Sequence, residues 1–157
     1  MSPRWRLAIV AVILAATIIV ASLSYLWLTP YHGTSPMIPS VTVTRTNVTD
    51  GVRFSIVSVS KTIPWGDVRI YVTEGLHVRY WEPSNRDFPR LGMNTTVALG
   101  NMTLGDRVVS CEILDNGDRY FGGGDEFTVS GSWGTYLVTL FDEPTGGAMF
   151  QDAFSIR

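Results

Sequence analysis

The sequence has very little of the residue types that carry covalent and catalytic chemistry. Its 157 residues include one cysteine, Cys111, and two histidines, His32 and His77. A lone cysteine cannot form a disulfide within the chain, and a domain of more than a hundred residues does not need one to fold. Neither histidine has a visible partner, and the spacings G-x-S-x-G, H-E-x-x-H and the P-loop are missing. We therefore predict that the protein is not an enzyme.

The cysteine itself lies in an alternating stretch of the chain. Val109, Cys111 and Ile113 fall on one face of a strand with the period of two that β-structure requires. Free cysteine is among the most buried residue types, whereas an intermolecular disulfide or a reactive thiol needs exposure. We expect Cys111 to be a small buried hydrophobe.

Basic residues are too few and too scattered for nucleic-acid binding. Arg4 and Arg6 are two of the twelve basic residues, and the ten that follow them face fourteen acidic residues, which gives a net charge near −4. Nucleic-acid binding depends on a concentrated positive surface. A nucleic-acid partner is therefore excluded from our predictions.

What the chain does contain is one long apolar run, Leu7–Leu28, directly after a short basic segment. At the helical rise it would span roughly 33 Å, about the thickness of the hydrocarbon core of a bilayer. Arg4 and Arg6 precede the run, and no lysine or arginine follows it until Arg45. Positive charge favours the cytoplasmic side, so residues 1–6 are predicted to be cytoplasmic and everything after Leu28 extracellular.

A cleavable signal peptide is the alternative interpretation of this run. Ala21, Ser22 and Ser24 offer small residues for cleavage, but the apolar region of a signal peptide covers only about 7 to 15 residues. We favour a retained transmembrane helix at the cell membrane, with the lipid bilayer as its partner. A linker over residues 29–40 with three prolines and no charge follows it, and residues 41–157 form one extracellular domain.

The extracellular domain has period-two patterns almost throughout, separated by turn signals such as Asp50-Gly51 and Asn116-Gly117. The predicted strands are 41–45, 52–59, 68–73, 76–80, 96–99, 107–114, 126–129, 135–141 and 148–156. No stretch after Ser40 supports a long amphipathic helix, which excludes a parallel α/β sheet. We predict an immunoglobulin-like antiparallel β-sandwich of about seven to nine strands.

An Asp/Gly-rich loop between two predicted strands is the strongest candidate for a metal site. Asp115, Asp118, Asp125 and Glu126 could supply the hard oxygen ligands that calcium prefers. The spacing does not fit an EF-hand, because only its first and last positions match. The alternatives are therefore a calcium loop of another kind and a plain glycine-rich hairpin loop without a cofactor.

Within this loop the pentapeptide Gly123–Phe127 spells GGDEF, and it resembles the signature of diguanylate cyclases. That resemblance implies an α/β domain in which the acidic residues serve metal and nucleotide. Here five residues match, the surroundings predict strands, and the predicted location is extracellular, away from GTP. A motif counts only with its structural context, so a metal-dependent or cyclase-like enzyme ranks last among the functions considered.

A second resemblance involves the loop, a later strand and the apolar run together. Four segments resemble parts of archaeal membrane-anchored surface proteins with a type IV pilin-like N-terminal helix. They are Asp115–Asp118, Gly124–Phe127, Tyr136–Leu140 and Ile13–Ala16. This resemblance implies either a filament subunit, whose processed helix packs in the filament core, or an anchored relative that does not polymerise. The run contains no glutamate, and Arg6-Leu7-Ala8 replaces the usual processing site, so we favour the anchored relative.

Two further sets of residues are candidates for contact with the surroundings. Three tryptophans are flanked by turn-forming residues: Trp65, Trp81 and Trp133. Their rings could stack on a glycan or anchor a protein partner, or they could cover the ends of the core. Asn47, Asn94 and Asn101 each begin an Asn-X-Thr triplet, which is the acceptor pattern for N-glycosylation. The chain is therefore predicted to be a cell-surface binding or structural module.

Overall fold

The computed structural model describes residues 37–88 and 91–157. The predicted transmembrane helix Leu7–Leu28 and most of the predicted linker lie outside these residues. Among the residues that the structure describes, no helix is long and apolar enough to cross a membrane. The described residues form one compact unit.

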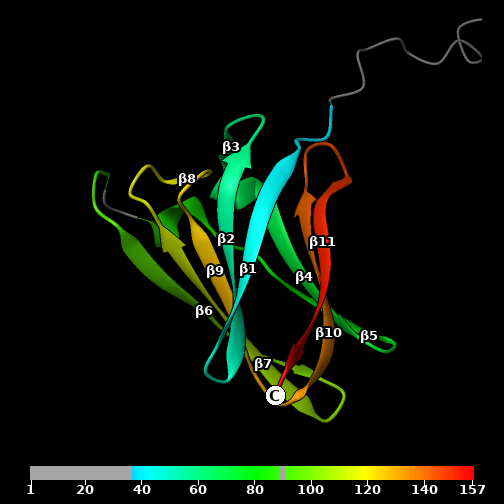
Figure 1. Cartoon of the computed structure of the whole chain (residues 1–157). Coiled ribbons are helices and arrows are strands. Elements are labelled where there is room, and N and C mark those ends of the chain that lie inside the picture. The colour runs from blue at the N-terminus through cyan, green and yellow to red at the C-terminus, as the bar shows by residue number, and fades with distance from the viewer. Residues whose placement is uncertain (1–36, 89–90) are drawn as a thin grey trace, which may run out of the picture. The chain divides into compact units, whose positions relative to one another are not determined.

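The described residues form antiparallel β-structure, as the sequence predicts (Figure 1). The strands are β1 (Val41–Val48), β2 (Gly51–Val59), β3 (Ile63–Pro64), β4 (Val68–Glu74), β5 (His77–Trp81), β6 (Thr95–Leu104), β7 (Arg107–Asp115), β8 (Tyr120–Phe121), β9 (Glu126–Gly131), β10 (Gly134–Asp142) and β11 (Gly147–Ile156). Two single-turn 3-10 helices, η1 (Trp65–Asp67) and η2 (Asn85–Asp87), interrupt them. All nine predicted strands are confirmed, with ends that differ by a few residues.

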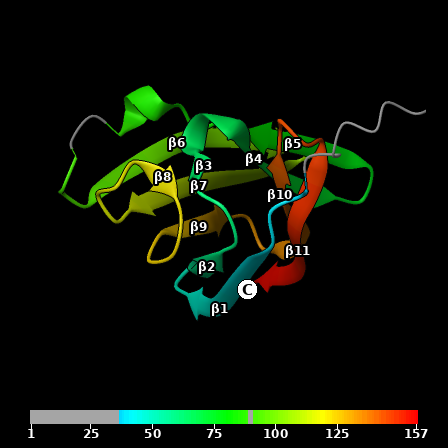
Figure 2. The same cartoon turned by 90° about the horizontal axis from the view of Figure 1, so that it is seen from above.

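Two large sheets pack face to face, and a small third sheet lies at one end of them (Figures 1 and 2). The five-stranded sheet has the order β1-β2-β9-β7-β6, and the four-stranded sheet has the order β11-β10-β4-β5. Strands β3 and β8 pair only with each other within the described chain. These two-residue strands are too short to show a period of two, so no alternation of apolar and polar residues predicts them.

Aromatic side chains from both large sheets meet in one core. The Phe54 ring of β2 stacks on Phe127 of β9, with 4.8 Å between ring centroids. Phe154 of the opposite sheet meets Phe54 edge to face at 5.4 Å, and it also packs on Tyr136. Such pairs add to the free energy gained from burying their area. Cys111 faces this core, 2% exposed, and burial raises the pKa of its thiol, which confirms the predicted small hydrophobe.

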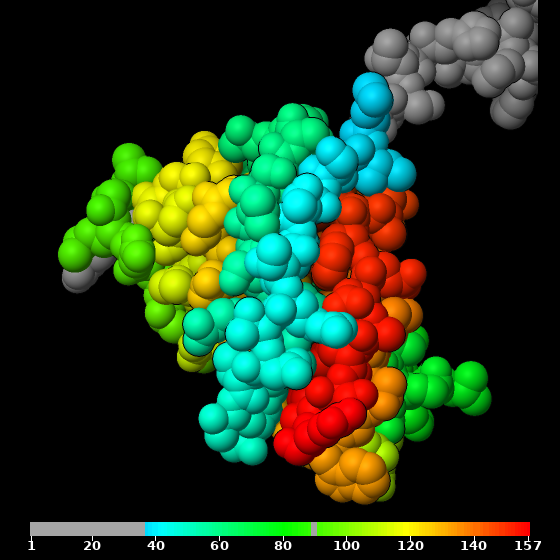
Figure 3. Space-filling view, viewed as in Figure 1, coloured from blue at the N-terminus to red at the C-terminus, as the bar shows by residue number. Residues whose placement is uncertain are grey.

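Polar contacts connect the edge strands of the two sheets. On one side Arg45 of β1 donates to the Asp152 carboxylate and to the Ala153 carbonyl of β11, each at 2.8 Å, and Figure 3 shows β1 lying alongside β11. On the other side the Trp81 indole donates to the Gly100 carbonyl of β6 at 3.0 Å. Gly100 lies at a register shift in β6 and has a φ of +87°, a backbone conformation that residues with a Cβ rarely adopt.

Candidate functional site

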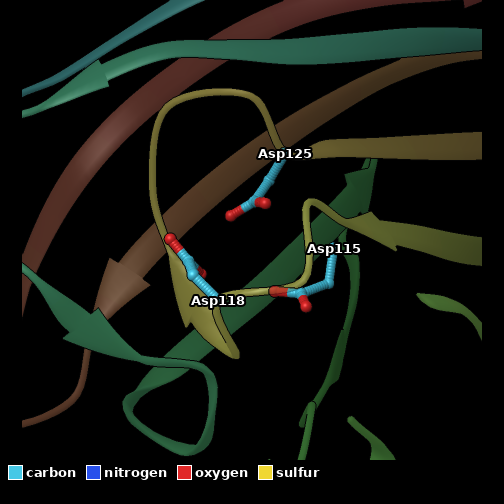
Figure 4. A group of neighbouring side chains, drawn as sticks. All are labelled: Asp115, Asp118 and Asp125. Atoms are coloured by element: carbon cyan, nitrogen blue, oxygen red, sulfur yellow. The ribbon is translucent and has the colours of Figure 1, made fainter. Parts of the chain in front are cut away.

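The predicted acidic loop connects the end of β7 to the start of β9 and contains the short strand β8, so it lies at the end of the sandwich where β3 and β8 pair. Its three aspartates, Asp115, Asp118 and Asp125, each place a carboxylate oxygen within 4.8 Å of the other two. Figure 4 shows their side chains pointing toward a common space inside the loop. The structure therefore brings together three of the four carboxylates that the sequence singled out.

Asp115 is fully buried and accepts hydrogen bonds from both its own loop and a distant segment. Its Oδ1 accepts from the indole nitrogen of Trp65 at 3.0 Å. Its Oδ2 accepts from the backbone N–H groups of Gly117 at 3.0 Å and Arg119 at 3.3 Å. The carboxylate thus fixes the first turn of the loop and joins it to the η1 segment.

Asp125 is also fully buried, at the other end of the loop. Its two oxygens accept from the backbone N–H groups of Asn116 at 2.9 Å and Gly122 at 2.7 Å. Burial raises the pKa of Asp125 to about 7, because the two N–H donors offset only part of the desolvation and the charges of Asp115 and Asp118 raise it further. Near neutral pH the cluster can therefore hold a proton on Asp125.

Asp118 is the exposed member of the cluster. Its Oδ1 accepts from the Tyr120 backbone N–H at 2.8 Å, and its other oxygen accepts no hydrogen bond from another described residue. Either a proton or a cation can relieve the repulsion among three carboxylates this close. The loop offers three side chains toward the six to eight oxygens that calcium takes, so waters and carbonyl groups would have to supply the others.

Glu126, the fourth predicted ligand, does not join the cluster. As the first residue of β9 it points to the opposite side from Asp125, since successive strand residues alternate between faces. Its carboxylate accepts from the Ser55 hydroxyl at 2.8 Å and pairs with the Arg53 guanidinium at 3.5 Å, both on β2. Glu126 therefore takes part in pairing between β2 and β9 on the outer face.

Each residue of the GGDEF pentapeptide has a local structural role. A Cβ on Gly123 would lie 2.8 Å from the Val57 carbonyl oxygen, and Gly124 has a φ of +96°, so both positions favour glycine. Asp125 holds the loop, and Phe127 lies in the core. The motif sits in antiparallel β-structure, whereas the cyclase resemblance implies an α/β domain.

The sequence analysis did not predict the groups that donate hydrogen bonds to the aspartates or hold their loop in shape. Trp65 is fifty residues from Asp115, and no local pattern connects the two. A structural role for Asn116 could have been predicted, because the sequence Asp-Asn-Gly is typical of a turn that a side chain caps. The Asn116 side-chain amide donates to the Gly123 carbonyl at 2.9 Å. Arg119 adopts a φ of +68°, uncommon for a residue with a side chain, and had no signal in the sequence.

The three candidate tryptophans have different surroundings. Trp65 is 0% exposed, stacked on Phe88 and edge-on to Phe121, and Trp81 is 4% exposed. These two are part of the core, as the alternative interpretation of their positions predicts. Trp133 is 76% exposed in the turn between β9 and β10. It is the one candidate tryptophan whose ring is open to a partner.

Trp133 lies at the opposite end of the sandwich from the acidic loop, and its position is held by Arg107. The Arg107 guanidinium lies over the indole ring, 5.1 Å from its centroid, and donates to the Trp133 carbonyl. Glu74 in turn holds Arg107 through an ion pair of 2.7 Å. A Cβ on Gly134 would clash with Arg107, which accounts for the glycine beside the indole.

A shallow hollow adjoins this indole. It is lined by the ion pair of Glu74 and Arg107, by Trp133 and Gly134, and by the last residues of the chain, with Arg157 among them. An indole next to a carboxylate and a guanidinium offers both an apolar ring and hydrogen-bonding groups. Such a combination suits contact with a sugar ring or with a protein side chain.

No protein-family model matches this sequence, and a search among curated proteins finds no match.

Proposed function

We propose that the protein is a single-pass, membrane-anchored cell-surface protein whose β-sandwich acts as a binding or structural module without enzymatic activity. The uncharged run Leu7–Leu28 and the positive charge before it support the anchor and the outward orientation. The observation that carries the binding role is Trp133, an indole 76% exposed yet held by Arg107 at the end of the sandwich. Its partner would be a glycan or a protein at the cell surface.

Preorganisation is what distinguishes Trp133 from an ordinary exposed hydrophobe. The Arg107 guanidinium over one side of the ring restricts the rotation of the indole, and its hydrogen bond to the Trp133 carbonyl holds the backbone of the turn, before any partner binds. A side chain that is already ordered loses less conformational entropy on binding. Tryptophan and arginine are also the residue types enriched among the strongest contributors to binding interfaces.

We further assign the sandwich to the immunoglobulin-like class. The order β11-β10-β4-β5 matches strands G, F, C and C′ of that class, and the order β1-β2-β9-β7 matches strands A, B, E and D, with each neighbouring pair antiparallel. Strand β6, at the edge beyond β7, is an addition to the pattern. Tyr136 at the start of β10 donates its hydroxyl to the Ser132 carbonyl at 2.7 Å, which resembles the tyrosine corner before strand F.

Intact mass and N-terminal sequencing of the protein from its own membranes test the anchor. We expect the mature protein to start before Leu7. We also expect protease added to intact cells to release the domain. A new start near Leu7 would instead support the filament-subunit alternative, in which the processed helix packs in a filament core. A start after Ser24 would mean cleavage of a signal peptide and would overturn the anchor.

Binding to an array of defined glycans and to purified cell-surface proteins tests the role of Trp133. Trp133→Ala is expected to abolish the binding that the unaltered chain shows. Tyr120→Ala removes an exposed aromatic ring at the opposite end, on β8, and is the matched control that should leave binding unchanged. Equal loss in both variants, or no loss in Trp133→Ala, would contradict a contact surface at Trp133.

A further inference from the structure

The asparagines of this chain divide into two groups by what their side chains do. Three of the five begin Asn-X-Thr triplets: Asn47, Asn94 and Asn101. All three are exposed, and none makes a side-chain hydrogen bond to another described residue. The threonines of the triplets, Thr49, Thr96 and Thr103, are exposed as well.

The two asparagines outside such triplets both hold the fold together. Asn85 accepts from the Gly66 backbone N–H at 3.0 Å. Asn116 donates to the Gly123 carbonyl at 2.9 Å and accepts from the Asp118 backbone N–H at 3.0 Å. Structural demands therefore account for the asparagines without the acceptor pattern and leave those with it unexplained.

Two of the triplets lie at the two ends of one strand, β6. Asn101 and Thr103 are paired in register with Ser110 and Val108, while Met102 between them is paired with the buried Val109. Because strand residues two apart share a face, the Asn101 amide and the Thr103 hydroxyl both lie on the outer face of the five-stranded sheet. Asn94 directly precedes β6, and Thr96 is exposed on the same face.

Strand β6 is also an edge strand. Within the described chain its ladder hydrogen bonds go to β7 alone, so its other side presents unpaired backbone groups over ten residues, apart from the Gly100 carbonyl that Trp81 reaches. Exposed edges of this length invite pairing with another chain, and native proteins protect them. The third triplet, Asn47-Val48-Thr49, runs from β1, the opposite edge of the same sheet, into the turn that follows it.

We propose that Asn94, Asn101 and Asn47 are N-glycosylated, and that the glycans at both ends of β6 shield this edge from pairing with other chains. In the transfer, the amide nitrogen forms a bond to the anomeric carbon of an oligosaccharide carried on a lipid phosphate. The bond from that carbon to the phosphate oxygen breaks, the lipid phosphate leaves with the electron pair, and the amide nitrogen loses one proton. The inference rests on the outward orientation proposed above, because the transfer takes place outside the cytoplasm.

Intact mass and glycopeptide mapping of the full chain from its own membranes test the modification. Thr103→Val keeps Asn101 and the strand preference but removes the acceptor pattern, whereas Thr103→Ser keeps the pattern. The valine variant is expected to lose the glycan at Asn101 alone, and the serine variant to retain it. An unmodified mass for the unaltered chain overturns the proposal, and glycans at Asn47 alone overturn the shielding of β6.

Protease treatment of the same intact cells distinguishes an absence of glycans from an error in the proposed location. If added protease removes the domain from intact cells while its mass is unmodified, the surface location stands and the glycans do not exist. If the domain is protected and unmodified, the location itself is wrong. Shielding is checked by light scattering: the double variant Thr96→Val/Thr103→Val should shift to larger size at high concentration, and the Thr96→Ser/Thr103→Ser variant should not.

Discussion

The two ends of the sandwich each carry a tryptophan beside a charged partner, and they use it in opposite ways. At one end the Trp65 indole donates to the buried Asp115 carboxylate and lies between Phe88 and Phe121. At the other end Trp133 lies under the Arg107 guanidinium and remains 76% exposed. A buried indole needs an acceptor for its N–H group, whereas an exposed one can leave that group to water. The difference between the core tryptophan and the surface tryptophan therefore lies in whether the indole N–H group is buried, since the residue type is the same.

The acidic loop and the Trp133 turn also differ in how their charges are balanced. The loop gathers three carboxylates with no basic side chain bonded to them among the described residues, and backbone N–H groups are their main donors. The Trp133 turn pairs Arg107 directly with Glu74. The first arrangement raises the pKa of Asp125 within the loop, while the second joins opposite charges directly.

Replacing each tryptophan with alanine should separate the two ends most strongly. Trp65→Ala removes a fully buried indole and leaves the Oδ1 of Asp115 without its donor, so it should lower the free energy of unfolding by about 3 to 5 kcal/mol. Trp133→Ala should change it by less than about 0.5 kcal/mol, as for most surface positions. Urea unfolding measures both. Similar losses in the two variants would remove the contrast between core and surface indoles.

Stability of the domain should decrease as the pH rises through the titration of Asp125. The pKa of Asp125 is about 7 in the folded state against an ordinary value of 3.8, so between these values the folded state binds more protons than the unfolded state. The free energy of unfolding therefore falls from about pH 4 to about pH 7, by up to about 4 kcal/mol, and then changes no further through this group. Thermal melting across this range measures the change.

Asp125→Asn is the control for that titration, because it removes the group that binds the proton. The variant should lose the decrease in stability between pH 4 and pH 7, even if its overall stability is lower. Glu126→Gln, which alters a neighbouring carboxylate outside the cluster, should keep the decrease. A variant Asp125→Asn with the same pH dependence as the unaltered chain would assign the titration to another group.

The calcium hypothesis predicts the smallest and most conditional effect. Calcium at 100 times its Kd would stabilise the domain by about 2.7 kcal/mol if the unfolded chain does not bind it. The melting shift should be larger at pH 8 than at pH 6, because a proton on Asp125 competes with the cation. Asp118→Asn should abolish the shift and Glu126→Gln should not. No shift at millimolar calcium at pH 8 would contradict a metal site in this loop.

Much of the fold could be predicted from local patterns. Alternation of apolar and polar residues over stretches such as Val109–Ile113 reports directly which face is buried, because side chains of a strand point to opposite faces in turn. The same rule separates Asp125 from Glu126, and applying it would have removed Glu126 from the metal site. The short strands β3 and β8 had no such period, and their pairing depends on the segments that the larger sheets bring together.

By itself the sequence determined the antiparallel β-structure, the burial of Cys111 and the presence of Asp115, Asp118 and Asp125 in one loop, since each depends on residues close to one another in the chain. Only the tertiary structure decided that Trp65 is the partner of Asp115, that Trp133 remains outside, and that two acceptor triplets bracket one edge strand. Those features depend on which strands become neighbours. Strand order joins residues far apart in the chain through backbone hydrogen bonds that every residue but proline can make, so the residue pattern alone does not specify it.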